Sequence, residues 1–409
     1  MTGSRAVVVG AGIVGAATAY ALAREGWRVT VVEASAAVGQ GASAANGGQL
    51  SYSYVEPLAT PAALRALPGW LLNADSPVRW RPRAAASHWR WLGGFVGACR
   101  TAQVRCTTEA LLALSALSRA TLKAWLAEGL AAPSLQHRQP GKLVLYRHAS
   151  ARPGVERQLA WQRALGCDQR VVDAPECRQI EPALPELITR SVAFGVWTSS
   201  EEVIDGAALT RALVTASGAD CRLGEKVVGF ERRGDRVVGL RLAGGSVLAA
   251  DQVIVAAGPD AAALLRPLRV PVPIEPIKGY SLTLPVRQAA RAPQVSITDA
   301  ARKMVFARLG PVLRVAGFAE LVGHDRALVP ARLAALREAT NRLFPGACDL
   351  DAAVPWAGLR PATPDGAPRI GATRWRGLWL NVGHGALGLT LAAGSAARLV
   401  AMMRADDVV

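Results

Sequence analysis

Apolar residues in this chain gather in short uninterrupted runs, and turn-forming residues separate the runs. Residues 6–9 and 29–32 are rich in valine and have the length and composition of strands that are buried on both faces. Residues 16–24 between them have helix-forming composition, and Gly26 is typical of a helix end. The pattern therefore predicts a strand–helix–strand unit near residue 1.

Further apolar runs predict the remaining elements and indicate an α/β fold with two domains. Most of these runs are short, carry β-branched residues and end at glycine or charged turns, as strands do. Two longer runs have the length and composition of helices. The predicted strands are 142–146, 225–230, 237–242, 251–258, 280–284, 313–316 and 377–382, and the predicted helices are 111–126 and 389–403.

Composition narrows the class of protein. Apolar residues form 51% of the 409 positions and charged residues 19%, so the chain has enough apolar surface to fold, and its length suits two or three domains. The six cysteines form no CxxC pair and no histidine completes a zinc spacing, so we expect no metal centre. We identify no secretory signal, and therefore expect reduced thiols and a cytoplasmic protein.

The net charge of +16 is carried almost entirely by arginine, because only five of the 47 basic residues are lysines. The arginines are scattered, whereas nucleic-acid binding predicts basic residues gathered on one element with stacking aromatics, so we expect no nucleic-acid partner. Residues 64–91 are different, because Trp70, Trp80, Trp89 and Trp91 are interleaved with arginines there. Trp and Arg together suit a membrane interface, and peripheral association with the inner face of the cell membrane is a hypothesis. Packing of these residues in the core is the alternative.

The sequence GAGIVG at 10–15 directly follows the first predicted strand. In such a motif Gly10 permits a tight turn, Gly12 lets a pyrophosphate approach the backbone, and Gly15 lets the helix pack closely on the sheet. The helix N-terminus offers N–H groups to the phosphates. Glu33 ends the second strand, where a carboxylate binds a ribose 2′-OH and disfavours a 2′-phosphate. The unit therefore predicts a dinucleotide other than NADP, and leaves NAD and FAD open.

Two later segments favour FAD. Residues 41–51 are rich in small residues and amides, which suits a backbone that runs along a large ligand. Residues 383–388 form a second glycine-rich turn between a predicted strand and a predicted helix. Such a turn offers N–H groups and a helix dipole to the negative charge that develops on a reduced flavin.

With these pieces in place, the chain resembles the D-amino acid dehydrogenase family, which is related to glycine oxidase and D-amino acid oxidase. The resemblance extends over nearly the whole chain and rests on several motifs in the family's order. The motifs are 7–15, Ser43-Ala44-Ala45-Asn46 with Gly48-Gln49, IKGYSLT at 277–283, GLRP at 358–361 with TPDG at 363–366, and 381–390.

The resemblance implies a discontinuous Rossmann-like FAD-binding domain and a mixed-sheet substrate-binding domain. It assigns residues 1–85, 203–268 and 350–409 to the first domain, and residues 86–202 and 269–349 to the second. The FAD-binding residues that we expect are Gly10, Gly12, Ile13, Val14, Gly15, Glu33, Ser43, Asn46, Gly48, Gln49, Val227, Ala257, Gly258, Arg360, Gly383, His384, Gly385, Leu387, Gly388 and Thr390.

The resemblance also implies the catalytic residues Arg360, Tyr280 and Tyr54. Arg360 lies in an otherwise apolar segment, and a guanidinium is a planar, permanently charged partner for an amino acid carboxylate. Tyr280 is expected beside the same carboxylate, and Tyr54 over the pocket. The reaction is then oxidative deamination of a D-amino acid to a 2-oxo acid and ammonia, by hydride transfer to flavin N5. The electrons would pass to a quinone or another carrier.

Three alternatives remain open. The chain could be a dehydrogenase of a cyclic imino acid such as D-hydroxyproline, an O₂-using oxidase of glycine or D-amino acids, or a flavin-binding subunit without activity. Residues 52–53 and 201–205 depart from the family's pattern near the expected substrate mouth. These departures bear on the identity of the substrate and leave the chemistry unchanged.

Overall fold

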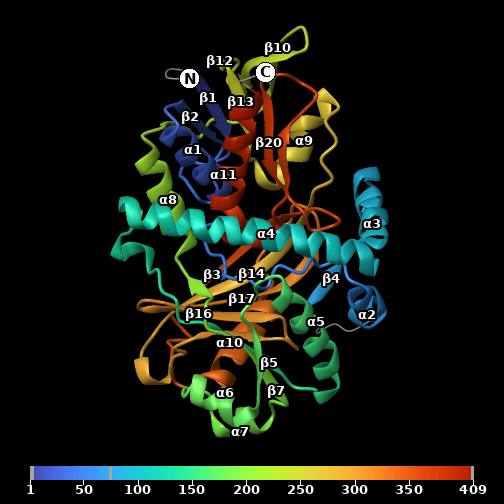
Figure 1. Ribbon diagram of the computed structural model, residues 1–409, viewed down its shortest axis with the longest axis vertical. Helices are drawn as coiled ribbons and strands as arrows, with labels where there is room; N and C mark the ends of the chain where they lie inside the picture. Colours follow the sequence, from blue (N-terminus) through green and yellow to red (C-terminus); the bar gives the residue numbers. More distant parts are fainter. Residues whose placement is uncertain (1–3, 73–75, 407–409) are drawn as a thin grey trace.

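The computed structural model describes residues 4–72 and 76–406. It has two halves that are stacked along the long axis, one built on a largely parallel sheet and the other on a large mixed sheet (Figure 1). The half with the parallel sheet is the upper one in Figure 1 and contains β1 (Arg5–Val9) and α11 (Gly388–Asp406). The α/β class predicted from the sequence is confirmed.

The upper sheet contains the predicted strand–helix–strand unit, β1, α1 (Ile13–Arg24) and β2 (Arg28–Glu33). All neighbouring strands in this six-stranded sheet are parallel except β19 and β20. Helix α1 packs against α8 (Gly206–Ser217) and α11. The other strands, in order from the edge, are β19 (Arg369–Ala372), β20 (Leu378–Val382), β13 (Gln252–Val255) before β1, and β9 (Asp220–Leu223) after β2. A three-stranded sheet of β10 (Val227–Arg233), β11 (Arg236–Leu242) and β12 (Val247–Ala249) lies in the same half (Figure 1).

The lower sheet has nine strands and two distinct faces. One face packs its apolar side chains, such as Leu282 and Phe306, against Leu336 of α10 (Pro330–Leu343). The other face is directed toward the upper half. Across the sheet the strands are β18 (Val354–Ala362), β14 (Glu275–Pro285), β17 (Val312–Leu321), β16 (Met304–Leu309), β15 (Ser296–Asp299), β5 (Lys142–Tyr146), β7 (Phe194–Thr198) and β6 (Arg170–Val172), with β4 (Val78–Trp80) beside β17.

Helix α4 (Thr101–Trp125) lies across the boundary between the halves (Figure 1). It packs closely on α11, because a Cβ atom on Gly394 would lie 2.6 Å from the backbone nitrogen of Ser118. It also contacts the segment that joins the halves, since Ser115 donates to the carbonyl of Tyr52 over 2.9 Å. On length and composition alone, segments 101–130 and 385–406 could cross a membrane, yet α11 lies between α1 and α4 as a core helix does.

Two smaller helices, α2 (Pro61–Leu72) and α3 (Ala86–Ala98), lie at one side of the molecule near β4 (Figure 1). His88 of α3 is fully buried and fixes this region. It accepts a hydrogen bond from the indole of Trp80 over 2.9 Å, and its other ring nitrogen lies 3.2 Å from the carboxylate of Glu275. Arg83 pairs with the same carboxylate. The helices α5 (Arg152–Ala164), α6 (Ala174–Ile180) and α7 (Glu186–Arg190) belong to the lower half (Figure 1).

The strand pairings differ from the predicted domain boundaries at two points. β18 lies in the range 350–409, which we had assigned to the FAD-binding domain, and β4 lies in the range 1–85. Both pair with strands of the lower sheet. These boundaries followed the order of the motifs along the chain, and that order does not show which sheet an edge strand joins.

Candidate active site

The first glycine-rich turn has the geometry of a phosphate site. Gly10 has a φ of +104°, and a Cβ there would lie 2.7 Å from the carbonyl oxygen of Ala256, at the end of β13. The turn therefore packs directly against Ala256 and Ala257, and Ala257 is one of the expected cofactor residues. A Cβ on Gly12 would meet only the hydroxyl of Ser43, at 3.6 Å. The space in front of Gly12 is open, as a pyrophosphate requires.

The expected adenosine end lies at Glu33. Its carboxylate accepts N–H bonds from Ala11 over 2.7 Å and from Ser35 over 2.8 Å, which fixes it at the tip of β2. The backbone N–H of Glu225 donates to the carbonyl of Glu33, so the start of β10 with Val227 lies close by. The structure thus brings together residues that are almost two hundred positions apart in the sequence.

The second glycine-rich turn lies beside the first. A Cβ on Gly388 would be 3.9 Å from Cγ2 of Ile13, so the starts of α1 and α11 face one another. Gly383 and Gly385 both have positive φ, and a Cβ on Gly383 would lie 2.7 Å from Cγ2 of Thr363. The N–H of Leu387 is bonded to the carbonyl of His384.

His384 is buried, and its Nε2 atom has no hydrogen-bond partner within the described part of the chain. Burial lowers its pKa to about 3, so the imidazole is neutral near pH 7. Oδ1 of Asn381, in the preceding strand, is orphaned in the same way. The amide nitrogen of Asn381 donates to Thr18 in α1 over 3.0 Å, so this side chain lies between the sheet and that helix. Buried polar atoms rarely lack partners, and the orphaned Nε2 of His384 at the turn indicates a polar ligand.

Residues 43–49 lie between the two halves. The Ser43 hydroxyl accepts the N–H of Ile13 over 2.9 Å, and Asn46 accepts the N–H of Gly48 over 3.0 Å in a tight turn. The Gln49 amide donates to the hydroxyl of Ser296 in β15. Thr390 is one of the expected cofactor residues, and its hydroxyl accepts the N–H of Ser51. Thr390 therefore binds the protein backbone in this structure. These side chains shape the site mainly by holding the segment in place.

Arg360 lies on the sheet face that is directed toward this segment. A Cβ on Gly279, in the neighbouring strand, would lie 2.4 Å from Nη2 of Arg360, so the guanidinium covers that glycine. On the same face the Ser281 hydroxyl donates to the carbonyl of Ala45. Arg360 keeps accessible surface although burial lowers its pKa, as expected of a side chain that lines an internal space. Its Nη1 donates to the carbonyl of Phe318 over 2.8 Å.

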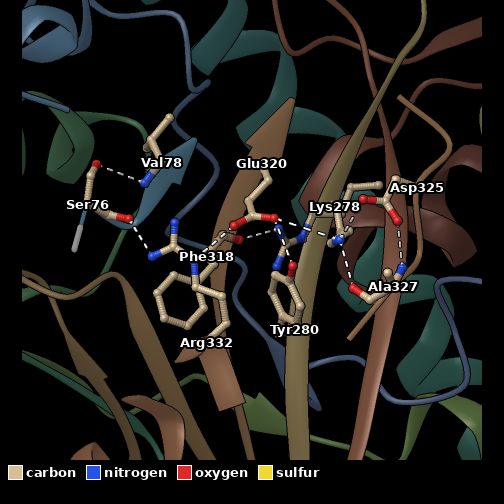
Figure 2. A network of polar contacts seen from close by, with 10 residues as sticks. Ser76, Val78, Lys278, Tyr280, Phe318, Glu320, Asp325, Ala327 and Arg332 are labelled. Carbon is tan, nitrogen blue, oxygen red and sulfur yellow. Dashed lines mark hydrogen bonds and ion pairs between the residues drawn. The ribbon is translucent and has the colours of Figure 1, made fainter. Parts of the chain in front are cut away.

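Tyr280 is not beside Arg360, and our expectation that both contact one carboxylate is wrong in this respect. Side chains alternate between the faces of a strand, so Tyr280 points away from the face that Gly279 and Arg360 share. Its phenol donates to Glu320 over 2.8 Å and its ring packs in the core of the lower half. Figure 2 shows Glu320 between Arg332 on one side and Tyr280 with Lys278 on the other.

Phe318 connects this buried network to Arg360. It has a φ of +65°, a strained value for an aromatic residue, at an irregularity in the pairing of β14 with β17. The Phe318 ring has Tyr280 at its edge and the guanidinium of Arg332 over it, 4.6 Å from the ring centroid (Figure 2). The network therefore surrounds the residue whose carbonyl binds Arg360.

Tyr54 lies on the same face of the sheet as Arg360, toward its other end. Its hydroxyl is 2.8 Å from that of Thr198 in β7, and its ring stands over the ammonium of Lys142 in β5. Burial raises its pKa, so the phenol keeps its proton. Lys142, Glu201 and Glu320 were not among the sequence candidates. The only sequence feature that could have identified these three residues is that each is a charged residue inside or beside an apolar run.

The donor set fits FAD. The N-cap residue of α1, Gly12, provides no side-chain cap, and the first turn of the helix has no acidic residue. Ser43 accepts the N–H of Ile13, and the other N–H groups at this helix end suit phosphates. Glu33 suits the ribose, and the orphaned Nε2 atom of His384 suits the polar edge of a flavin ring. Among the described residues, no group of three His, Cys, Asp or Glu side chains is placed to hold a metal ion.

Comparisons with known proteins agree with this geometry. A family model described as FAD dependent oxidoreductase matches residues 5–403. The chain is 46% identical over 406 residues to D-amino acid dehydrogenase 2 of Ralstonia nicotianae, which covers 96% of this chain and 94% of that protein. It is 47% identical to D-amino acid dehydrogenase 2 of Pseudomonas aeruginosa, over 96% of this chain and 92% of that protein.

Solved structures show the same fold at low identity. Glycine oxidase from Bacillus cereus has a TM-score of 0.75 and 19% identity, and covers 98% of this chain and 95% of that chain. L-proline dehydrogenase from P. horikoshii has a TM-score of 0.73 and 17% identity, over 99% of this chain and 94% of that chain. Below 25% identity these likenesses support the architecture and do not select a substrate.

Proposed function

Because this chain belongs to the family of FAD-dependent oxidoreductases, we propose that it is a D-amino acid dehydrogenase, which converts D-amino acids to 2-oxo acids and ammonia. The substrate loses a hydride from Cα and a proton from nitrogen, and water then hydrolyses the imino acid. Bound FAD supplies the two-electron acceptor. The residues placed to hold it are those of the two glycine-rich turns, Glu33 and segment 43–49.

The observation that carries the proposal is the position of Arg360. Its guanidinium borders the space between the lower sheet and segment 43–49, and Gly279 beneath it leaves room for the side chain to lie flat. A carboxylate there would receive two parallel N–H bonds, which fix the orientation of the substrate. Tyr54, which stays protonated, can donate a hydrogen bond but cannot act as a base.

Anaerobic titration of the purified yellow protein with a panel of D- and L-amino acids tests this function. We expect D-amino acids to bleach the flavin and L-amino acids to leave it oxidised. Selective bleaching by cyclic imino acids, or rapid reoxidation by O₂, would assign the chain to one of the alternative enzymes. If no amino acid bleaches the flavin, the proposed activity is excluded.

For the electron acceptor we propose a quinone in the membrane, reached from the surface formed by α2, β4 and α3. Three large apolar side chains are exposed there, namely Leu64, Trp89 and Val96, and Trp89 and Val96 each expose about half of their surface. Arg65 and Arg90 are exposed beside them. Trp and Arg together bind the interface of an anionic bilayer. The Trp70 side chain and residues 73–75 lie outside the described residues.

Flotation of the holoenzyme with anionic lipid vesicles tests this surface. We expect binding at low salt that is lost in the variant Trp89→Glu. Leu187→Glu is the matched control, because Leu187 is also exposed but belongs to α7 at the far end of the lower half (Figure 1). Equal binding by both variants, or none by the unaltered protein, would exclude this surface as the membrane contact.

A further inference from the structure

The five lysines of this chain have an unusual distribution. Arginine fills 42 of the 47 basic positions, so the few remaining lysines are the exception. Lys123 and Lys226 are exposed, but Lys142, Lys278 and Lys303 all lie in the lower sheet or its turns. Lys142 is 5% exposed and Lys278 is 1% exposed. A lysine differs from an arginine because its ammonium group is compact and can lose its proton. The two buried positions, Lys142 and Lys278, therefore suit a small cation of this kind.

Lys142 lies beneath segment 51–54 and touches it twice. Its ammonium donates to the hydroxyl of Ser51 over 2.9 Å and stands 4.3 Å from the centroid of the Tyr54 ring. The neighbouring strands place Ser296 and Thr198 beside it, and neither carries a charge. The charged or titratable groups that face it are therefore Tyr54 and Glu201.

Glu201 holds the same segment from the other side. Its carboxylate is buried and accepts the backbone N–H groups of Tyr52 over 2.7 Å and of Ser53 over 2.8 Å. Burial raises the pKa of Glu201, while its attraction to Lys142 opposes that shift. Burial lowers the pKa of Lys142 to about 8, and Glu201 opposes that shift in turn. Each charge thus makes the other less costly to bury.

Segment 51–54 also joins the two halves. At its start, Ser51 is bonded to Thr390 at the beginning of α11, and Tyr52 is bonded to α4 through Ser115. At its end, Tyr54 reaches Thr198 in β7. A loosened segment would release the tyrosine that we place on the substrate side of the sheet.

We propose that Lys142 and Glu201 together hold segment 51–54 and thereby position Tyr54 for substrate binding. The inference rests on the proposed function. Both are positioning residues, because the contacts of Lys142 and Glu201 described above are with segment 51–54.

Kinetics of the variants Lys142→Met and Glu201→Gln tests the pair. We expect KM for the D-amino acid to rise about tenfold in each, with kcat changed less than threefold. The exposed Lys123→Met is the matched control and should behave as the unaltered enzyme. An unchanged KM in both Lys142→Met and Glu201→Gln would overturn the proposal.

Two further measurements do not depend on activity. Hydrogen exchange at the Tyr52 and Ser53 amides of the holoenzyme should quicken about tenfold in Lys142→Met and stay unchanged in Lys123→Met. Between pH 8 and 10.5 the unfolded chain binds more protons at Lys142 than the folded chain, so this residue should raise stability as the pH rises. Lys142→Met should lack that contribution.

Unchanged exchange in Lys142→Met would show that the pair does not hold the segment. If Lys142→Met fails to fold, the same hydrogen-exchange and KM measurements are made on Glu201→Gln. Should the unaltered flavin not be bleached by any amino acid, the proposed function fails, and the exchange and stability measurements still decide whether the pair holds segment 51–54.

Discussion

The phenol of Tyr280 lies 2.8 Å from the carboxylate of Glu320, on the face of the sheet opposite Arg360. Tyr280 and Arg360 lie in neighbouring strands, yet they have different roles. Arg360 lines the space for the substrate, whereas Tyr280 completes a buried network beneath it. Several consequences of this arrangement can be measured.

Replacing Arg360 by Met should remove substrate binding and leave the fold intact. The bidentate contact with a carboxylate contributes about 3 kcal/mol, so kcat/KM should fall roughly a hundredfold. FAD content and thermal unfolding should stay close to those of the unaltered enzyme. Arg211→Met serves as the control, because Arg211 is exposed on α8. An unchanged kcat/KM would remove Arg360 from the site.

Tyr280→Phe should affect stability more than catalysis. It deletes one hydrogen bond to a buried carboxylate, which costs about 1–2 kcal/mol of the free energy of unfolding. We expect kcat/KM to stay within threefold of the unaltered value. Chemical denaturation and steady-state kinetics measured together decide this point. A hundredfold loss of kcat/KM without loss of stability would restore a direct role for the phenol.

Glu320→Gln should be far more damaging than Tyr280→Phe. Glu320 also accepts the Nε–H of Arg332 over 2.9 Å, and its removal leaves a buried guanidinium without its charge partner. Breaking a buried pair in this way costs about 3–5 kcal/mol. The expected outcome is a lower unfolding midpoint together with a raised KM, because Phe318 and with it Arg360 lose their support. A stable variant with normal KM would contradict the network's proposed role.

Substitutions at two glycines of the first turn should have opposite effects on fold and cofactor. A Cβ on Gly12 has free space, so Gly12→Ala should fold but retain little FAD. A Cβ on Gly15 would lie 1.9 Å from the carbonyl oxygen of Gly10, so Gly15→Ala should reduce the yield of folded protein itself. Circular dichroism and flavin absorbance of the purified variants separate the two cases. Full FAD content in Gly12→Ala would contradict the assigned phosphate site.

His384 should give stability a dependence on acid pH. Its pKa falls from 6.5 in the unfolded chain to about 3 in the folded one, so between these values the unfolded chain binds the extra proton. Stability should therefore decrease as the pH falls from about 6.5 toward 3, and His384→Phe should weaken that decrease. The exposed His148→Phe is the control. Unfolding midpoints measured across this pH range give the comparison.

Much of the upper half could be predicted from the sequence, because its signals are local. The first turn, both flanking strands and the helix all lie within residues 5–33, and the structure has them there. The strand 142–146 was also predicted with its observed bounds. In each case a short apolar run, bounded by glycine or charge, carries enough information by itself.

The face on which a residue lies was harder to predict. From the sequence we expect Tyr280, in the motif IKGYSLT, beside the substrate carboxylate, although adjacent residues of a strand point in opposite directions and its neighbour Gly279 is the one on the Arg360 face. Gly279, the one residue in that motif without a side chain, was the better guide, because the guanidinium of Arg360 covers it. Lys142 and Glu201 were missed because only the three-dimensional fold brings them to the same four-residue segment.

The close packing of α11 on α4 couples Gly394 in the C-terminal helix to the segment that joins the two halves. A methyl group on Gly394 would press on the backbone of α4 at Ser118, one helical turn from the hydroxyl that holds the Tyr52 carbonyl. A wider crossing would shift α4 and with it the Ser115 hydroxyl, so segment 51–54 would lose one of its anchors. Gly394→Ala should therefore lower the unfolding midpoint, because the added Cβ would lie 2.6 Å from the backbone of α4.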